Sequence, residues 1–524
     1  MPAQSQDETI AFLKSAAFDD GDASTVETVV THISTILLSG ERAIKLKRPA
    51  HLPYVDFSTP ERRLTSCEQE LVLNRRTAPE LYRAVRQVTR EPDGGLAIDG
   101  SGPLVDAYVD MRRFDEDCLL DRMAMEGTLT VPLMARLAHR IAVFHAGIAP
   151  DRSVTGSAQV ALVLDINERA LATTDVFPAA AVDEFNRRFR DGLTRLAPLL
   201  DARGAAGKIR RCHGDLHLRN ICVFDGEPTL FDCLEFDEAM ATTDILYDLA
   251  FLLMDLWHRG LEELANLVLN RYLDESDETD GLPLLAFLMA LRAAVRAHVT
   301  ATRVAEAGPD APTLRAEAHD YFALALDLLR PRPGRLVAVG GLSGSGKSTV
   351  AAAIAPRIGP PPGARILASD RIRKHLFGVA AETPLPAECY RPQVSETVYA
   401  RLAEQAGAIL PLGHGVVADA VFDRAPDRER IAGMGEGGST PFLGLWLEAP
   451  PERLVERVAA RRDDPSDATP EVVRDQLSRS RAPADWMHLS SVAEIGAVAE
   501  AARRIVDGTT DDPAGEREDD RRKG

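Results

Sequence analysis

Apolar and polar residues follow three different patterns along this chain, and each pattern predicts a different architecture. Between residues 27 and 48, "ETVVTHISTILLSGERAIKLKR" has two β-rich runs around a Ser-Gly-Glu-Arg turn, which predicts a hairpin. From about 130 to 328, apolar residues recur at helical spacing, as at Leu133, Leu137 and Ile141. After the linker "LRPRPG" at 329–334, the apolar run "RLVAVGG" predicts a buried strand. We therefore expect a small β-rich lobe, a larger helical lobe and an α/β domain, in that order.

The composition narrows the function classes. The chain has 524 residues, too many for a single core, and 45% of them are hydrophobic, as in globular proteins. The formal net charge of −19 argues against nucleic acid or an anionic membrane as the main partner. Six cysteines without a CxxC pair, and a first segment without a signal-peptide pattern, predict a cytoplasmic protein with reduced thiols. The charged stretch at 507–524 predicts a disordered tail, and the oligomeric state does not follow from these numbers.

A phosphate-binding loop is the strongest motif. The stretch "GLSGSGKST" lies between an apolar strand and a predicted helix, as a Walker A loop requires. Its glycines let backbone N–H groups face the phosphates at a helix N-terminus, while a lysine reaches the β/γ-phosphates and a serine ligates Mg²⁺. We expect nucleotide contacts from Gly341, Ser343, Gly344, Ser345, Gly346, Lys347, Ser348 and Thr349, with Ser348 also on the metal.

Residues after this loop indicate what the nucleotide is used for. Asp370 follows the predicted strand "RILAS" and is placed to accept a proton from a substrate hydroxyl, although it can equally cap the next helix. Asp419 ends the strand in "GVVADA" and is expected to hold Mg²⁺; the next residue, Ala420, is no second acid, which favours transfer to a substrate over hydrolysis. Arg461 is expected to close over the nucleotide as part of an arginine lid, the alternative being a solvated helix end. In these features residues 335–506 resemble P-loop kinases of the gluconate-kinase and zeta-toxin type.

A second catalytic pattern occurs at 211–236, in "RCHGDLHLRNICVFDGEPTLFDCLEF". Phosphoryl transfer needs a carboxylate beside the attacking hydroxyl and positioned metal ions. Asp215 is spaced to be that carboxylate, and Asn220 and Asp232, on two sides of a predicted hairpin, are spaced to hold Mg²⁺. The alternative is a turn whose polar residues only cap helices and join strands.

This segment resembles the aminoglycoside-phosphotransferase-like branch of the protein-kinase fold, which has a similar HGDLH-x-x-N loop. The resemblance implies a two-lobed domain with ATP in the cleft, and an N-lobe lysine paired with a helix glutamate. Lys45 and Lys47 point the same way from one strand, and "CEQE" supplies Glu68 and Glu70. We favour Lys45 with Glu68, and leave the other pairings open.

Taken together, the chain resembles a bacterial family of fused aminoglycoside-phosphotransferase-like and P-loop ATP-binding proteins. The expected fold is an α+β protein-kinase-like bilobal domain at 25–328 (N-lobe about 25–110, C-lobe about 111–328), followed by an α/β P-loop kinase domain with a mostly parallel sheet at 335–506. The resemblance implies ATP (or GTP) and Mg²⁺ as cofactors at two sites, and transfer of the γ-phosphoryl group to a hydroxyl of a small molecule. Two alternatives stay open: a P-loop domain that acts as a regulatory nucleotide switch, and a toxin-like kinase that acts on a macromolecule.

Overall fold

The chain divides into two compact units in a computed structural model that describes residues 6–18, 26–31, 33–52, 55–436, 440–460 and 465–508. The first unit comprises Met1–Gly260 and Phe287–Leu326, and the second comprises Leu261–Ala286 and Asp327–Gly524. The segment Leu261–Ala286 therefore belongs with the P-loop domain, although it lies inside the range 25–328 expected for the kinase-like domain. The predicted tail lies outside the described residues beyond Gly508.

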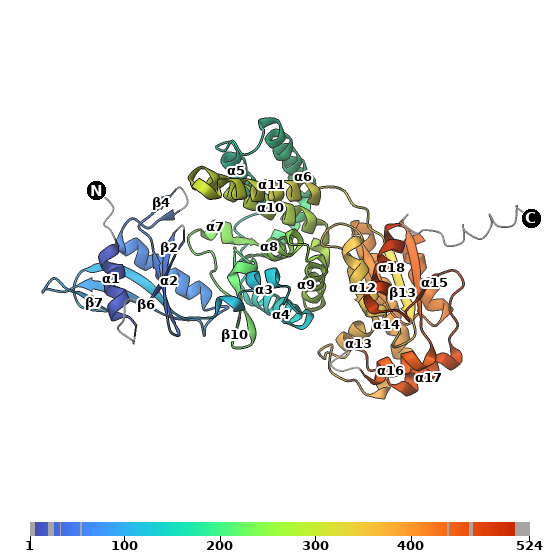
Figure 1. Ribbon diagram of the computed structural model, residues 1–524. Coiled ribbons are helices and arrows are strands. Elements are labelled where there is room, and N and C mark those ends of the chain that lie inside the picture. Colours follow the sequence, from blue (N-terminus) through green and yellow to red (C-terminus); the bar gives the residue numbers. More distant parts are fainter. Residues whose placement is uncertain are drawn as a thin grey trace, which may run out of the picture. The chain divides into compact units, whose positions relative to one another are not determined.

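The N-lobe of the first unit is built on an antiparallel sheet of six strands in the order β1-β2-β3-β8-β6-β7 (Figure 1). The predicted hairpin forms its centre, with Ile36 opposite Lys45 and Ser34 opposite Lys47. Thr59 caps helix α2 (Pro60–Asn74), which packs on β8 and β6 and shares a buried core with Tyr82 and Val109. The other bounds are α1 (Asp7–Ala16), β1 (Glu27–Val30), β2 (Ser34–Ser39), β3 (Arg42–Lys47), β4 (His51–Leu52), β5 (Val55–Asp56), β6 (Tyr82–Arg90), β7 (Leu96–Ile98) and β8 (Leu104–Arg112).

Helices make up most of the C-lobe, as the periodicity predicts. The hairpin of β10 (Ile221–Phe224) and β11 (Glu227–Leu230) interrupts them at the expected place. Helix α8 (Ile245–His258) is buried along nearly its whole length, which its continuous apolar sequence explains. The remaining bounds are α3 (Leu120–Glu126), α4 (Val131–Gly147), α5 (Gly156–Leu171), α6 (Ala179–Ala205), β9 (Ile209–Arg211), η3 (Leu218–Asn220), α7 (Glu238–Ala241), β12 (Thr242–Asp244), α10 (Leu285–Arg303) and α11 (Ala311–Leu328).

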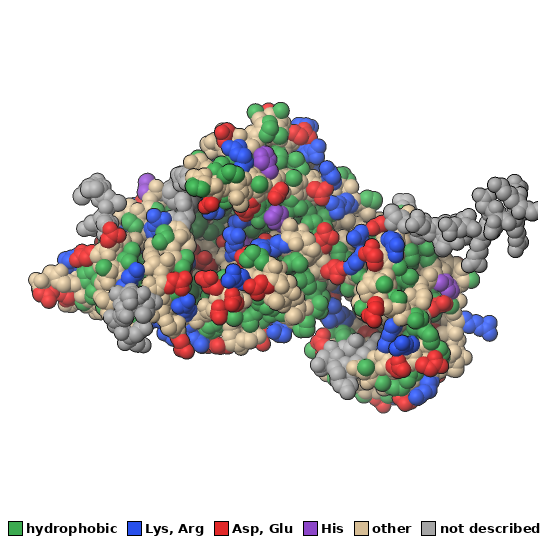
Figure 2. Space-filling view, in the orientation of Figure 1, with side chains coloured by type: hydrophobic (Ala, Val, Ile, Leu, Met, Phe, Trp, Pro, Cys, Tyr) green, Lys and Arg blue, Asp and Glu red, His purple; other side chains and the backbone are tan. Residues whose placement is uncertain are grey.

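One helical stretch in the described part of the chain, Thr279–Arg303, is long and apolar enough to cross a membrane. In its most apolar window 72% of the residues are buried inside the protein, as in a core helix. All six cysteines are free thiols, as expected. Acidic and basic side chains are interspersed over the face shown in Figure 2.

The second unit contains a five-stranded, fully parallel sheet in the order β14-β15-β13-β16-β17. Valines of β13 and β15 pack against α12 and α18 in one apolar core. The bounds are β13 (Leu336–Gly341), α12 (Lys347–Ile354), β14 (Arg365–Ala368), α13 (Ser369–Leu376), α14 (Pro392–Ile409), β15 (Val416–Asp419), α15 (Ala425–Glu436), β16 (Phe442–Glu448), α16 (Pro451–Ala459), α17 (Pro470–Arg479), β17 (Met487–Ser490) and α18 (Ile495–Asp507).

Helix α9 (Glu262–Glu275) lies against the edge strand β14 of this sheet. The buried Asn270 Oδ1 accepts a hydrogen bond of 2.7 Å from the backbone N–H of Ile366, and Asn266 Nδ2 donates to the carbonyl of Ala364 at 3.0 Å. Asp274 forms an ion pair of 2.7 Å with Arg365. These contacts satisfy backbone groups on the open edge of β14, and they explain why α9 belongs to the second unit.

Candidate functional site

Two N-lobe lysines and three carboxylates form a buried charge network in the first unit. Lys45 Nζ lies 2.8 Å from Glu70 Oε1 and 2.5 Å from Asp232 Oδ1. Lys47 Nζ lies 2.6 Å from Glu70 Oε2 and also pairs with Glu235. The Lys47 side chain is completely buried, whereas that of Lys45 is 11% exposed. Lys45 is therefore the lysine that a bound phosphate can reach.

The favoured pairing of Lys45 with Glu68 is wrong, because the partner is Glu70. Helix α2 buries Arg63, Cys67, Glu70 and Asn74, which recur at helical spacing on the face toward the sheet. Glu68 is exposed on another face. The alternative that the sequence left open, Glu70, is the one that helical spacing places opposite the lysines.

The charge state of this network follows from its surroundings. Burial alone would raise the pKa of Glu70, but Lys45 and Lys47 lower it to about 2. Burial opposes the charged form of Lys45 as well, yet Asp232 and Glu70 hold its pKa well above the usual value. The Lys45–Glu70 pair is therefore ionised at neutral pH.

The HGDLH segment forms a compact loop around Asp215. Asn220 Nδ2 donates to Asp215 Oδ2 at 2.8 Å and to the Asp215 carbonyl at 3.0 Å. His217 Nε2 lies 3.4 Å from Asp215 Oδ2, and His213 bonds backbone groups at Phe231 and Asp215. Desolvation would raise the pKa of Asp215, but His217, His213 and Arg292 hold it well below the usual range. With 40% of its side chain exposed, Asp215 is an accessible and ionised carboxylate.

A buried carboxylate fixes the backbone of this loop. Asp248, in α8, accepts hydrogen bonds from the N–H groups of His213 (3.2 Å) and Gly214 (2.8 Å), and contacts His145 Nε2 at 3.1 Å. The motifs found in the sequence do not single out this residue. One feature of the sequence could have identified it: a carboxylate inside an apolar helix is buried and therefore requires hydrogen-bond partners.

Two residues of this unit fit a divalent cation. Because Asn220 uses its Nδ2 to hold Asp215, its carbonyl Oδ1 is the atom that suits a hard cation. Asp232 follows β11 with a backbone φ of 60°, and its carboxylate is 39% exposed beside Lys45. An oxygen donor set of this kind fits Mg²⁺.

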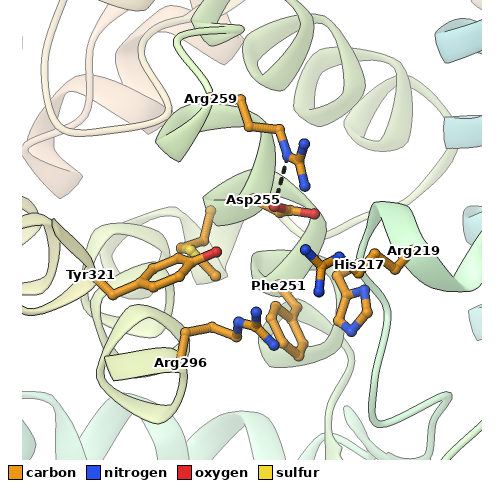
Figure 3. Close-up of a pocket in the computed structure, with 8 residues that line it drawn as sticks. His217, Arg219, Phe251, Asp255, Arg259, Arg296 and Tyr321 are labelled. Carbon is orange, nitrogen blue, oxygen red and sulfur yellow. Dashed lines mark hydrogen bonds and ion pairs between the residues drawn. The ribbon is translucent and has the colours of Figure 1, made fainter. Parts of the chain in front are cut away.

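A pocket opens next to the catalytic loop, within the same unit (Figure 3). It lies between η3, α8, α10 and α11. Cationic and aromatic side chains dominate its lining, which consists of His217, Arg219, Phe251, Met254, Asp255, Arg259, Arg296 and Tyr321. None of the lining arginines stands out in the sequence.

In the second unit, the predicted Walker A residues form the expected loop between β13 and α12. Gly341, Gly344 and Gly346 have positive φ angles of 136°, 88° and 89°. A side chain at Gly341 would also meet the Leu447 carbonyl at 2.6 Å, and one at Gly344 the Leu454 carbonyl at 2.6 Å. Glycine is therefore required at these positions for both conformation and space.

The two P-loop side chains expected to bind Mg²⁺ lie next to each other. Ser348 Oγ donates to Asp419 Oδ2 at 2.6 Å, and Asp419 ends β15, the strand beside β13. Lys347 Nζ donates to the Leu342 carbonyl at 3.1 Å. Gln476 of α17 accepts from the Ser343 N–H at 2.9 Å, so α17 lies over the loop. No sequence motif singles out Gln476.

The acidic and basic residues that follow have different placements. Asp370 lies in the first turn of α13, just after β14; the N-cap is Ala368, so capping does not explain Asp370. Arg373 and Lys374 are buried: Arg373 donates to the Cys389 carbonyl before α14, and Lys374 pairs with Asp467. Arg457 donates to the Ser491 carbonyl at 2.8 Å and approaches the Gly344 carbonyl at 3.4 Å. Arg461 lies outside the described residues.

Comparison with known proteins agrees with this geometry in both units. Residues 132–288 match a family described as "Phosphotransferase enzyme family", and residues 336–483 match one described as "AAA domain". The protein is a kinase in which a phosphotransferase domain of the aminoglycoside-phosphotransferase type is joined to a P-loop kinase-like domain. This confirms the fold class and the resemblance derived from the motifs.

The sequence aligns with relatives over most of its length. The chain is 28% identical to uncharacterized proteins of Mycobacterium tuberculosis and Mycobacterium bovis over 474 residues, which cover 89% of this chain and 91% of theirs. Among solved structures, it is similar to a sugar kinase from Janibacter (24% identity, 33% of this chain and 95% of that one, TM-score 0.25). It is also similar to a choline/ethanolamine kinase family protein from Mesorhizobium loti (16% identity, 62% of this chain and 95% of that one, TM-score 0.40).

Proposed function

We propose that the N-terminal unit transfers the γ-phosphoryl group of ATP to a hydroxyl group of a small molecule, with Mg²⁺ as cofactor. The observation that carries the proposal is the position of Asp215, an accessible, ionised carboxylate held by Asn220 in a loop that Asp248 anchors. A carboxylate in this state can accept the proton of an attacking hydroxyl.

Each residue near Asp215 has a separate role in this proposal. Lys45, fixed by Glu70, binds the phosphates of the nucleotide, and Asn220 and Asp232 hold the metal through their oxygens. The bound metal neutralises charge that develops on the phosphates. Asp215 orients the substrate hydroxyl and takes its proton.

In the C-terminal unit we propose a second nucleotide site at the Walker A loop. Lys347 and the loop N–H groups bind phosphates, and Ser348 with Asp419 holds Mg²⁺. Asp370 serves there as the base for a hydroxyl acceptor.

A regulatory role for the C-terminal unit is the second candidate. It is favoured by the burial of Arg373 and Lys374, which leaves those two cations committed to neighbouring protein groups. The variant Asp370→Asn distinguishes the candidates. If the unit is a switch that only binds nucleotide, the variant keeps its full effect on the activity of the N-terminal unit. If the unit is a kinase, the variant loses turnover at this site and retains nucleotide binding.

The function is tested by measuring ADP formation and phosphorylated product over a panel of hydroxylated compounds. Wild-type protein is compared with Asp215→Asn and Lys347→Ala. We expect Asp215→Asn to abolish product formation at the N-terminal site while nucleotide binding persists. Equal turnover in wild type and Asp215→Asn for every acceptor would refute the assignment.

A further inference from the structure

The pocket beside Asp215 is lined by cationic side chains from three elements. Arg219 belongs to η3, Arg259 follows α8, and Arg296 belongs to α10. Figure 3 shows Arg219 and Arg296 extending into the space between Tyr321 and His217. A pocket of this composition suits a ligand of opposite charge.

Its position makes it the place where an acceptor substrate would lie. His217 lines the pocket and also lies 3.4 Å from the Asp215 carboxylate, so the lining reaches the proposed base. The edge of the His217 ring packs on Phe251, with centroids 4.9 Å apart, which fixes the wall between pocket and base. A molecule in the pocket can therefore present a hydroxyl to Asp215.

The acidic groups at the pocket are fully used by the protein. Asp255 is the only carboxylate among the lining residues; its Oδ1 accepts from Arg259 at 3.0 Å and its Oδ2 from the Leu218 N–H at 3.0 Å. Asp121, outside the lining, pairs with Arg259 at 2.5 Å and with Arg219 at 3.3 Å. Among the described lining residues, no carboxylate oxygen is left without a protein partner.

The aromatic side chains are likewise engaged with cationic or basic groups. Tyr321 stacks on His258 with centroids 4.1 Å apart, and the Arg296 guanidinium lies over its ring at 5.4 Å. The Arg292 guanidinium lies over Phe251 at 4.7 Å. A quaternary or primary ammonium would have to displace these groups to reach an aromatic face.

Arg219 and Arg296 have long ion pairs, and Arg296 also hydrogen-bonds Tyr321. Arg296 lies 3.6 Å from Glu317, and Arg219 lies 3.3 Å from Asp121. The formal charges of the lining arginines and of their carboxylate partners cancel. The reason to expect an anionic ligand is therefore that these guanidinium groups can exchange partners, and not that the pocket has an excess of positive charge. Partly exposed, long pairs of this kind are weak, and a phosphate or carboxylate can replace them with shorter bidentate bonds.

We propose that this arginine pocket, defined by Arg219, Arg259, Arg296 and His217, is the acceptor site of the N-terminal unit. Its substrate is a hydroxylated small molecule that carries a phosphate or carboxylate group. This assignment rests on the function proposed above.

The transfer balances without a further reactant. The substrate hydroxyl oxygen forms a bond to the γ-phosphorus, the bond from that phosphorus to the β–γ bridging oxygen breaks, and ADP leaves with the electron pair. The hydroxyl proton passes to Asp215, and the arginines hold the anionic group of the substrate away from the reacting oxygen.

The test uses the full-length protein with ATP, Mg²⁺ and acceptors matched in skeleton but differing in charge. Glucose 6-phosphate and glycerol 3-phosphate represent phosphates, gluconate and glycerate represent carboxylates, glucose and glycerol are neutral, and choline and kanamycin are cationic. The variants are Arg296→Gln and the more exposed Arg219→Gln, with Arg315→Gln of α11 as a matched control outside the pocket. Thermal unfolding verifies that each variant is folded.

We expect turnover only with anionic acceptors. Whether the phosphate or the carboxylate compounds are phosphorylated shows which anionic group the pocket binds. Loss of one charged hydrogen-bonding group should raise KM about 10- to 100-fold in Arg296→Gln, with a smaller change in kcat and none in Arg315→Gln. Turnover confined to neutral or cationic acceptors, no anionic turnover, or a KM that neither pocket variant changes would overturn the proposal. If that turnover still depends on Asp215, the proposed function survives the loss of the substrate assignment; if it does not, both fail.

Discussion

Replacing Glu70 by Gln should destabilise the N-terminal unit and weaken nucleotide use. Glu70 is completely buried and contacts both Lys45 and Lys47. The substitution therefore removes the carboxylate that these two buried ammonium groups share. A pKa lowered from 4.5 to about 2 corresponds to about 3 kcal/mol of stabilisation of the charged form. Removal of one member of a buried ion pair costs about 3–5 kcal/mol, which agrees with that figure.

The assay is hydrogen exchange with peptide resolution, because it reports opening of α2 and β3 separately from the second unit. The matched control is Glu68→Gln on the same helix, where an exposed residue should change stability by less than about 0.5 kcal/mol. In the wild type, the contribution of Glu70 is present above its unfolded pKa near 4.5 and should be lost as pH falls toward about 2. Equal protection in both variants, or a larger loss in Glu68→Gln, would refute the reasoning.

Three further outcomes follow from the contacts described. Asp248→Asn should lower kcat about 10- to 100-fold, because the His213 and Gly214 N–H groups lose their charged acceptor; steady-state kinetics checks this, and unchanged kcat would contradict it. Ser348→Ala should weaken Mg²⁺-dependent nucleotide binding about 10- to 100-fold but leave binding in EDTA nearly unchanged. Calorimetry in a Lys45→Ala background measures this binding, and equal losses of affinity in both buffers would exclude a metal role for Ser348. Asn270→Ala should destabilise the second unit by about 1–3 kcal/mol, because the Ile366 N–H loses its acceptor. Urea unfolding followed by hydrogen exchange at β14 measures this loss, and unchanged exchange would show that the edge contact is unimportant.

Short-range patterns account for what the sequence predicted well. The Walker A loop, the hairpin at β10 and β11 and the pairing of β2 with β3 depend on residues close in sequence. The strand ending at Asp419 carries its carboxylate to Ser348 because adjacent parallel strands end at the same edge of a sheet.

The missed features depend on contacts between distant residues. Glu68 and Glu70 differ by two positions, and only the packing of α2 on the sheet decides which one meets the lysines. The arginine pocket joins residues from 217 to 321, and no single segment contains its pattern. The membership of α9 in the second unit was equally invisible, since its contacts involve residues more than 90 positions later.

The path of α9 has a practical meaning for how this protein can be divided. The chain leaves the first unit after Gly260, returns to it at Phe287 and leaves again after Leu326, so neither unit is encoded by one uninterrupted stretch. A fragment starting at the 329–334 linker would lack Asn270 and present an uncovered strand edge at β14, which invites self-association. Because the two units are interleaved in the sequence, a cut at the 329–334 linker would leave α9 on the wrong fragment.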